Sequence, residues 1–261
     1  MLAQERFQSI ADLVAVQQKM SVHELQSALG VSPATLRRDL AELESLGKIV
    51  RVRGAVVHPS YFRGEPSFEQ KRRSAAGVKR AIASAAAALV PLKSTVWIDA
   101  GTTCLELGAL LLSRRDLTIL THSIPLAARA VESEEGAQII LLGGQVRAIS
   151  GAVVGALGLD WTKNLRADWC FLGASGLSAE GVSTTELSEA TMKTAILGRC
   201  EHKVLLCDAQ KWNASATVVF AAWRDFDFWV CGGDFEVGAR ETAEKLGPEF
   251  LWASENRGKT P

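Results

Sequence analysis

From Ala75 onward, short apolar runs alternate with stretches of helical periodicity. The runs are rich in residues that favour strands, and they lie at 95–98, 117–120, 138–142, 169–172, 203–207 and 228–231. Repeated strand–helix alternation requires crossover connections, which join parallel strands and place helices on both faces of the sheet. The sequence therefore predicts an α/β fold with a mostly parallel sheet for this larger part of the chain.

A helix of different character comes before this part. Ser32 can cap its start, and Pro33 suits the first helical position, where the N–H that proline lacks would be unbonded anyway. At about 100° per residue, one narrow stripe is apolar, and it consists of Leu36, Leu40 and Leu43. The opposite face carries small residues and arginines, namely Ala34, Arg37, Arg38 and Ala41. Such a face suits the major groove of DNA, and an ordinary solvated surface helix is the alternative.

The segments before this helix favour DNA binding. Residues 3–17 have helical periodicity, and Ser21 can cap a shorter helix over 22–29 that Gly30 ends. Two short helices, a glycine turn and a third helix that exposes arginines make a helix-turn-helix.

A short hairpin follows. Basic and apolar residues alternate over 48–53, and a glycine then turns the chain into 55–58. The side chains of Arg51 and Arg53 can contact the DNA backbone beside the major groove. The helices and this hairpin together predict a winged helix-turn-helix domain at 1–58.

Charge and composition agree with this division. Residues 1–73 contain 11 Lys+Arg and 8 Asp+Glu, leaving +3, whereas the remaining residues contain 18 and 21, leaving −3. A mildly basic N-terminal part suits a DNA-binding domain. No apolar run is long enough to span a membrane, and a signal peptide's basic and apolar segments are missing at the start. We therefore expect a cytoplasmic protein with no membrane partner.

The cysteines indicate the same compartment. They form no CxxC pair, their number is odd, and three lie in apolar strand-like runs. Buried free thiols in a reducing cytoplasm are the expected state of Cys104, Cys170, Cys200, Cys207 and Cys231. We expect no metal ion, no cofactor and no catalytic residue.

Ligands of parallel α/β sheets bind at the carboxyl ends of the strands. The first such end carries Asp99, Gly101, Thr102 and Thr103, and a helical pattern follows. Gly101 lets the backbone approach an anion, and the N–H groups that open the helix can hold a phosphate together with the two threonine hydroxyls. This arrangement predicts a phosphate site.

The other strand ends converge on the same edge. One carries Thr121, His122 and Ser123, and at another Lys211 can neutralise a phosphate while Asp208 holds it or a sugar hydroxyl. Small residues at the remaining ends can leave room for a ligand, and they include Gly143, Gly144, Ser150, Gly151, Gly155, Gly173, Ser175 and Gly176. Turns need such residues in any case. Six convergent ends nevertheless favour a phosphorylated sugar or polyol as ligand.

Two motifs stand in the N-terminal part: Ser-x-x-Thr-x-Arg-Arg-Asp-Leu at 32–40 and Arg-x-x-Gly-Ala at 51–55. Both resemble the DeoR family of bacterial transcription regulators. The family usually has two glycines before the wing alanine, whereas Arg53 fills the first of these positions here. The resemblance implies four positions that face DNA, namely Ser32, Thr35, Arg37 and Arg38.

The resemblance continues over nearly the whole chain. It rests on Asp-Ala-Gly-Thr-Thr at 99–103, Thr-His-Ser at 121–123, Gly143-Gly144, Phe-Leu-Gly-Ala-Ser-Gly at 171–176, Glu189 with Lys193, and Asp208 with Lys211. These motifs are similar to the family's sugar-phosphate-sensing domain, whose fold is similar to that of ribose-5-phosphate isomerase. The resemblance implies that these residues, Glu189 and Lys193 included, bind the effector. The family commonly has Asn where His122 stands, a change that can alter which hydroxyl is recognised.

The 261 residues are enough for two domains. We expect a connector at 59–73 and an effector-binding α/β domain at 74–261. The resemblance implies a repressor of a sugar or polyol catabolic operon, released from double-stranded operator DNA by a phosphorylated sugar intermediate. It also implies a homo-oligomer, because one winged helix contacts one half-site and specific sites pair two.

An active sugar-phosphate isomerase with a DNA-binding head is the alternative function. Aldose–ketose isomerisation needs a carboxylate as general base. The isomerase has acidic residues in the segment that corresponds to 173–176, and this chain has none there. Glu189 could substitute, so the alternative stays open. Nucleotide binding by a Rossmann-type domain is a weaker third possibility, because G-x-G-x-x-G is missing.

Overall fold

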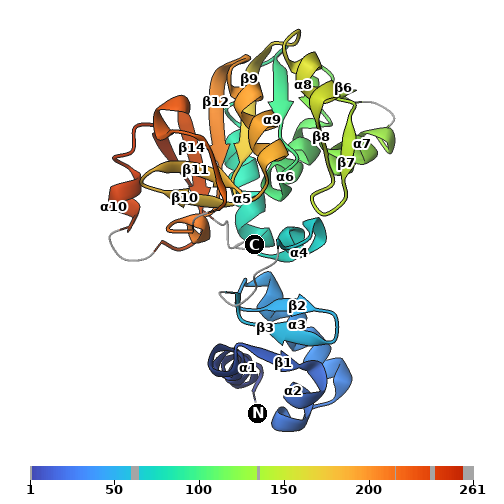
Figure 1. Ribbon diagram of the computed structural model, residues 1–261, viewed down its shortest axis with the longest axis vertical. Helices are drawn as coiled ribbons and strands as arrows, with labels where there is room; N and C mark the ends of the chain where they lie inside the picture. The colour runs from blue at the N-terminus through green and yellow to red at the C-terminus, as the bar shows by residue number, and fades with distance from the viewer. Residues whose placement is uncertain (1, 60–64, 134–135, 215, 236–238, 255–261) are drawn as a thin grey trace, which may run out of the picture. The chain divides into compact units, whose positions relative to one another are not determined.

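The structure is a computed structural model, and it describes residues 2–59, 65–133, 136–214, 216–235 and 239–254. The chain divides into two compact units, Met1–Ala76 and Gly77–Pro261 (Figure 1). Of the segment expected to be the connector, 60–64 lies outside the described residues, and the described remainder belongs to the first unit.

The first unit begins with the three predicted helices, α1 (Ala3–Gln17), α2 (Val22–Leu29) and α3 (Pro33–Ser45). The Ser21 hydroxyl accepts a hydrogen bond from the backbone N–H of Glu24 (3.0 Å), which caps α2. Gly30 ends α2 with φ +62°, a left-handed conformation that glycine adopts without strain. The predicted caps and turn are therefore confirmed.

The leucine stripe of α3 lies in the core of this unit. Leu36, Leu40 and Leu43 are each at most 3% exposed. They pack with apolar residues of the neighbouring elements, namely Ile10, Val14, Met20, Leu25, Ile49 and Val56. This packing fixes which face of α3 remains exposed.

A three-stranded antiparallel sheet, of order β1-β3-β2, completes the winged helix. Its strands are β1 (Lys19–Ser21), β2 (Val50–Val52) and β3 (Ala55–Val57). The predicted wing is the hairpin of β2 and β3, in which Val52 pairs with Ala55, so that Arg53 and Gly54 form the turn. Gly54 has φ +75°, as such a tight turn requires. β1 is an additional strand that the sequence analysis does not contain.

The second unit is built around a seven-stranded sheet of order β15-β14-β12-β9-β4-β5-β6. All its neighbouring strands are parallel. Its strands are β4 (Thr95–Ile98), β5 (Thr118–Thr121), β6 (Gln138–Leu141), β9 (Ala167–Gly173), β12 (Cys200–Leu206), β14 (Phe228–Gly232) and β15 (Glu249–Ala253). The six predicted strands are confirmed, and β15 is new.

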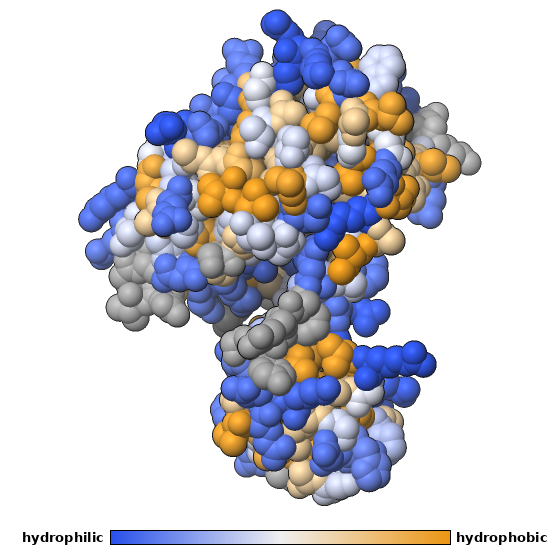
Figure 2. Space-filling view, in the orientation of Figure 1, coloured by the Kyte–Doolittle hydropathy of each residue, from blue (hydrophilic) through white to orange (hydrophobic). Residues whose placement is uncertain are grey.

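Helices alternate with most strands of this sheet along the chain (Figure 1). They are α5 (Ala76–Ala87), α6 (Thr102–Leu111), α7 (Ile124–Val131), α8 (Ala156–Thr162), α9 (Leu187–Leu197) and α10 (Ala239–Ala243). Trp97, Phe171 and Trp229 are the largest fully buried side chains in the described part of this unit. Apolar side chains also reach its surface, as Figure 2 shows for one face. No described helix has the length and hydrophobicity to cross a membrane.

Two small antiparallel groups extend the parallel sheet. One is the hairpin of β7 (Gln145–Arg147) and β8 (Ala152–Val154). The other consists of β10 (Gly176–Ser178), β11 (Gly181–Thr184) and β13 (Val218–Ala221). All five cysteines are free thiols, as the sequence predicts, and four of them are buried, whereas Cys200 at the start of β12 is only partly buried.

Candidate DNA-binding and effector-binding sites

The face of α3 opposite the leucine stripe is exposed. Arg37, Arg38 and Ala34 are all exposed there. Ser32 and Thr35 form the start of the helix: the Ser32 hydroxyl accepts a hydrogen bond from Thr35 N (3.2 Å), and the two hydroxyl oxygens lie 2.9 Å apart. A capped helix thus presents two arginines to a partner, which is the geometry that major-groove binding requires.

Asp39 follows these arginines and points the opposite way, into the unit. Both oxygens of its carboxylate accept hydrogen bonds from the Arg6 guanidinium. Nε donates to Oδ2 (2.7 Å), and Nη2 donates to Oδ1 (2.9 Å). This hydrogen-bonded pair raises the pKa of Arg6. It attaches α3 to α1 and so sets the direction of Arg37 and Arg38. The sequence analysis missed this role, although Asp39 belongs to the motif at 32–40.

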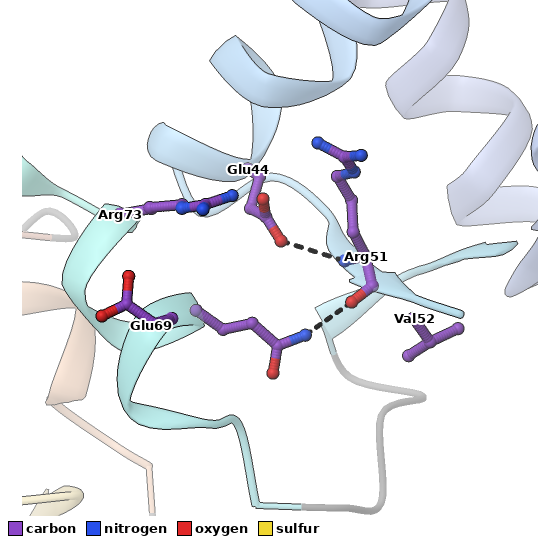
Figure 3. A pocket seen from close by; sticks show the side chains of 6 residues that line it. Glu44, Arg51, Val52, Glu69 and Arg73 are labelled. Atoms are coloured by element: carbon purple, nitrogen blue, oxygen red, sulfur yellow. Dashed lines mark hydrogen bonds between the residues drawn. The ribbon is translucent and has the colours of Figure 1, made fainter. Parts of the chain in front are cut away.

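The two wing arginines have different environments. Arg53 is exposed in the turn, whereas Arg51 is half-buried in β2, an edge strand. Both backbone groups of Arg51 bond to side chains: its N–H donates to Glu44 Oε1 (3.3 Å), and its carbonyl accepts from Gln70 Nε2 (2.5 Å), as Figure 3 shows. The free edge of the wing is therefore covered.

Gln70 belongs to α4 (Phe68–Arg73), a helix in the segment expected to be the connector. Its amide oxygen also accepts from the backbone N–H of Ser67 (2.9 Å), which caps α4. Between α4, α3 and β2 lies a small cleft lined by Glu44, Arg51, Val52, Glu69, Gln70 and Arg73 (Figure 3). One side chain thus joins the start of α4 to the wing.

In the second unit, the ends of the neighbouring strands β4, β5 and β9 meet around Asp99. Asp99 is 1% exposed. Its Oδ2 accepts hydrogen bonds from Lys193 Nζ (2.5 Å) and from the backbone N–H of Gly173 (2.9 Å), and its Oδ1 lies 3.3 Å from Nε2 of His122. Lys193 Nζ also donates to the carbonyl of Gly173 (3.1 Å). We call Asp99, His122, Gly173 and Lys193 the aspartate cluster.

The charges of this cluster compensate one another. Burial acts to raise the pKa of Asp99, but the Lys193 ammonium and the hydrogen bond from His122 hold it well below its ordinary value. Burial acts to lower the pKa of Lys193, and the Asp99 carboxylate more than offsets this. Both groups are therefore charged. The cluster fastens α9 to the strand ends.

The start of α6 lies beside the cluster. A Cβ atom at Gly101 or at Gly173 would stand 3.4 Å from Asp99 Oδ2, so both backbones pass close to the carboxylate. Gly101 is the N-terminal cap residue of α6, and no side chain caps it. The N–H groups of a first helical turn have no partner within their helix. Together with the hydroxyls of the buried Thr102 and Thr103, they are donors of the kind that bind anions at helix starts.

Other predicted residues bond within the protein. Thr121 donates its hydroxyl hydrogen to the carbonyl of Ile98 (2.7 Å), and the Ser123 hydroxyl caps α7 by accepting from Leu126 N (3.3 Å). The backbone N–H of Ser175 donates to a β11 carbonyl (2.9 Å). These contacts fix the strand ends in place.

Packing explains why glycine stands at two of the predicted positions, because a larger residue would collide with a neighbouring strand or loop. A Cβ at Gly144 would stand 2.6 Å from a carbonyl oxygen of β8, and one at Gly176 would stand 2.1 Å from the carbonyl oxygen of Ala214. At Gly143, by contrast, nothing in the described part would meet a Cβ within 4 Å.

The remaining predicted residues lie on α9 and after β12. Glu189 Oε1 accepts a hydrogen bond from Nη1 of Arg147 (3.0 Å), a β7 residue that the sequence analysis did not single out. Asp208 is buried and accepts from Gln210 N (3.1 Å), which starts a short 3-10 helix at Ala209–Lys211. Lys211, at its end, is half-exposed.

A winged helix that exposes arginines, joined in one chain to a larger α/β unit, is the architecture of a DNA-binding transcription regulator. The sequence profile of the DeoR-like helix-turn-helix domain matches residues 6–61, and that of the DeoR C-terminal sensor domain matches residues 74–232. The chain belongs to the DeoR family, as its motifs predict.

Curated relatives match along most of their length. The uncharacterised HTH-type transcriptional regulator YgbI of Escherichia coli is 35% identical over 87% of this chain and 89% of its own. The HTH-type transcriptional regulator GlpR of Haloferax volcanii is 34% identical over 95% and 96%. The glycerol-3-phosphate regulon repressor of Escherichia coli is 33% identical over 82% and 84%.

Among solved structures, ribose 5-phosphate isomerase A of Methanocaldococcus jannaschii aligns over 53% of this chain and 55% of its own, with 15% identity and a TM-score of 0.39. This likeness is too low to bear on function. The relatives above are named as regulators, and the isomerase alternative gains no support from them. Glu189, the carboxylate left open as a general base, is paired with Arg147.

Proposed function

We propose that this chain is a repressor that binds operator DNA through α3 and the wing and releases it when a phosphorylated sugar or polyol binds to the second unit. The observation that carries the proposal is the uncapped start of α6 at Gly101, set against the aspartate cluster at the carboxyl edge of the sheet. Helix starts hold phosphate through free N–H groups and the helix dipole.

The counter-charge for the phosphate comes from Lys211 in this proposal. Lys193 is buried and already paired with Asp99, whereas Lys211 is half-exposed and follows β12, the strand beside β9 in the sheet. One of the relatives is named a glycerol-3-phosphate regulon repressor. That name supports a small phosphorylated polyol as the effector class here.

Thermal shift of the purified chain with a panel of phosphorylated sugars and polyols tests the proposal. A ligand at 100-fold over its Kd adds roughly 2.7 kcal/mol to the free energy of unfolding.

We expect Lys211→Ala to weaken effector binding more than operator binding, so that the repressor becomes hard to induce. Lys163→Ala is the matched control, because Lys163, the residue directly after α8, is an exposed lysine. A wild-type induction curve for Lys211→Ala would show that the phosphate binds elsewhere.

A further inference from the structure

His122 is a buried histidine with one unused nitrogen. The residue is 1% exposed, and its Nε2 faces Asp99 Oδ1 at 3.3 Å. The other ring nitrogen, Nδ1, is also buried, and it has no hydrogen-bond partner among the residues that the structure describes. Buried polar side-chain atoms are usually hydrogen-bonded, so an unpaired one calls for an explanation.

The surroundings determine what Nδ1 can do. The Asp99 carboxylate is ionised and can only accept, so the ring hydrogen is on Nε2, as the hydrogen-bond network assigns it. Asp99 and Lys193 already neutralise each other. With the ring hydrogen on Nε2 and directed at Asp99, Nδ1 carries a lone pair that can accept a hydrogen bond.

The neighbouring polar side chains of the same strand end are used differently. The Thr121 hydroxyl is bound to the β4 backbone, and the Ser123 hydroxyl caps α7. Among these three residues, only His122 keeps an unpaired acceptor atom. This acceptor follows β5, and the helix start at Gly101 follows the adjacent strand β4. Neighbouring strands lie about 5 Å apart, a distance that a short carbon chain spans.

We propose that Nδ1 of His122 accepts a hydrogen bond from a hydroxyl of the effector and so selects phosphorylated polyols that carry this hydroxyl. The inference rests on the proposed function, in which the phosphate of the same ligand binds at the start of α6. His122 is then a specificity-determining residue, and its Nε2 holds the ring in place against Asp99.

Two substitutions separate the two nitrogens. His122→Asn keeps a polar atom close to the position of Nδ1 but is too short to reach Asp99. His122→Gln reaches Asp99 with an amide donor but has no acceptor at the position of Nδ1. His202→Gln is the matched control, because His202 lies within β12, where its ring centroid is 4.4 Å from that of Trp169.

Calorimetry then compares the panel member that most stabilises the wild type with its deoxy analogues, each lacking one hydroxyl, and with inorganic phosphate. We expect the wild type, His122→Asn and His202→Gln to prefer the parent compound over one particular deoxy analogue on the order of tenfold, as for one hydrogen bond. We expect His122→Gln to lose this preference while it binds the analogue and inorganic phosphate as the wild type does.

The wild type gives a second readout that needs no variant. In protein with ¹⁵N-labelled histidine, the Nδ1 resonance of His122 should move upfield when the parent compound binds and stay in place with the deoxy analogue. Three results would each overturn the assignment. The resonance could stay in place with the parent compound, or His122→Gln could still prefer the parent compound over the deoxy analogue. His122→Gln could also lose affinity equally for the parent compound, the deoxy analogue and inorganic phosphate. If no panel member stabilises the wild type, the proposed function itself fails, and the inference fails with it.

Discussion

Arg37 and Arg38 project from the exposed face of α3, while Asp39 beside them is buried and holds Arg6. We expect Arg37→Ala or Arg38→Ala to lower operator affinity by roughly 1–3 kcal/mol without unfolding the unit. Fluorescence anisotropy with a duplex selected from a random-sequence pool measures the affinity, and Arg240→Ala, an exposed arginine of the second unit, is the control. Unchanged affinity in the folded double variant would remove α3 as the DNA-binding element.

Asp99 and Lys193 form a buried ion pair, so the loss of one partner leaves the other uncompensated. We expect Asp99→Asn to lower the free energy of unfolding by roughly 3–5 kcal/mol at pH 7. Adding Lys193→Met should recover part of this loss, because the unpaired ammonium is then removed. Denaturant titration measures all three variants. Equal stability of Asp99→Asn and the wild type would show that the pair is not formed.

The pH dependence follows from the lowered pKa of Asp99. The folded state holds this carboxyl ionised below its ordinary pKa, so the unfolded state takes up the proton first as the pH falls. Its contribution is therefore fully present above about pH 4 and is lost as the pH decreases further. We expect the stability of Asp99→Asn to fall less steeply than that of the wild type in this acid range.

At the scale of elements, Gln70 connects α4 to the wing strand β2. Both Gln70→Ala and Gln70→Glu remove the donor to the Arg51 carbonyl, but only the glutamate keeps an acceptor that can cap α4. We expect both variants to speed deuterium exchange in β2 and β3, with a loss of about 1 kcal/mol in stability. If Gln70→Glu exchanges like the wild type, the contact to Arg51 contributes nothing to the wing.

The elements also show what can be predicted from sequence. Ser21, Gly30 and Ser32 act on residues within four positions of themselves, so local patterns identify α2 and α3. The strand β1 has three residues and depends on pairing with β3, a distant segment, so no local period marks it.

The candidate site likewise has a part that local sequence predicts and a part that depends on contacts between distant residues. The glycine and threonines at 101–103 carry a local signal for a helix start that can bind an anion. The pairing of Asp99 with Lys193 spans 94 positions and exists only because α9 packs over the strand ends. For that reason the motifs predict both residues as effector contacts, whereas in the structure they are bound to each other. Arg147, the partner of Glu189, was missed for the same reason.

At the scale of the molecule, the geometry of operator binding bears on the oligomeric state. One winged helix contacts one half-site, and specific sites usually pair two. We therefore propose a homo-oligomer, and light scattering at micromolar concentration should give a multiple of 28.0 kDa. A strict monomer, with and without operator DNA, would contradict this.

The central claim is that one ligand site in the second unit controls DNA binding by the first. Its most direct test is an anisotropy titration of the selected operator duplex with the full chain, with and without the strongest effector at saturation, paired with calorimetry of that effector with and without operator. We predict that the effector lowers operator affinity by a factor of about 5 to 150, and that operator lowers effector affinity by the same factor. An effector that binds tightly and leaves operator affinity unchanged would contradict the account.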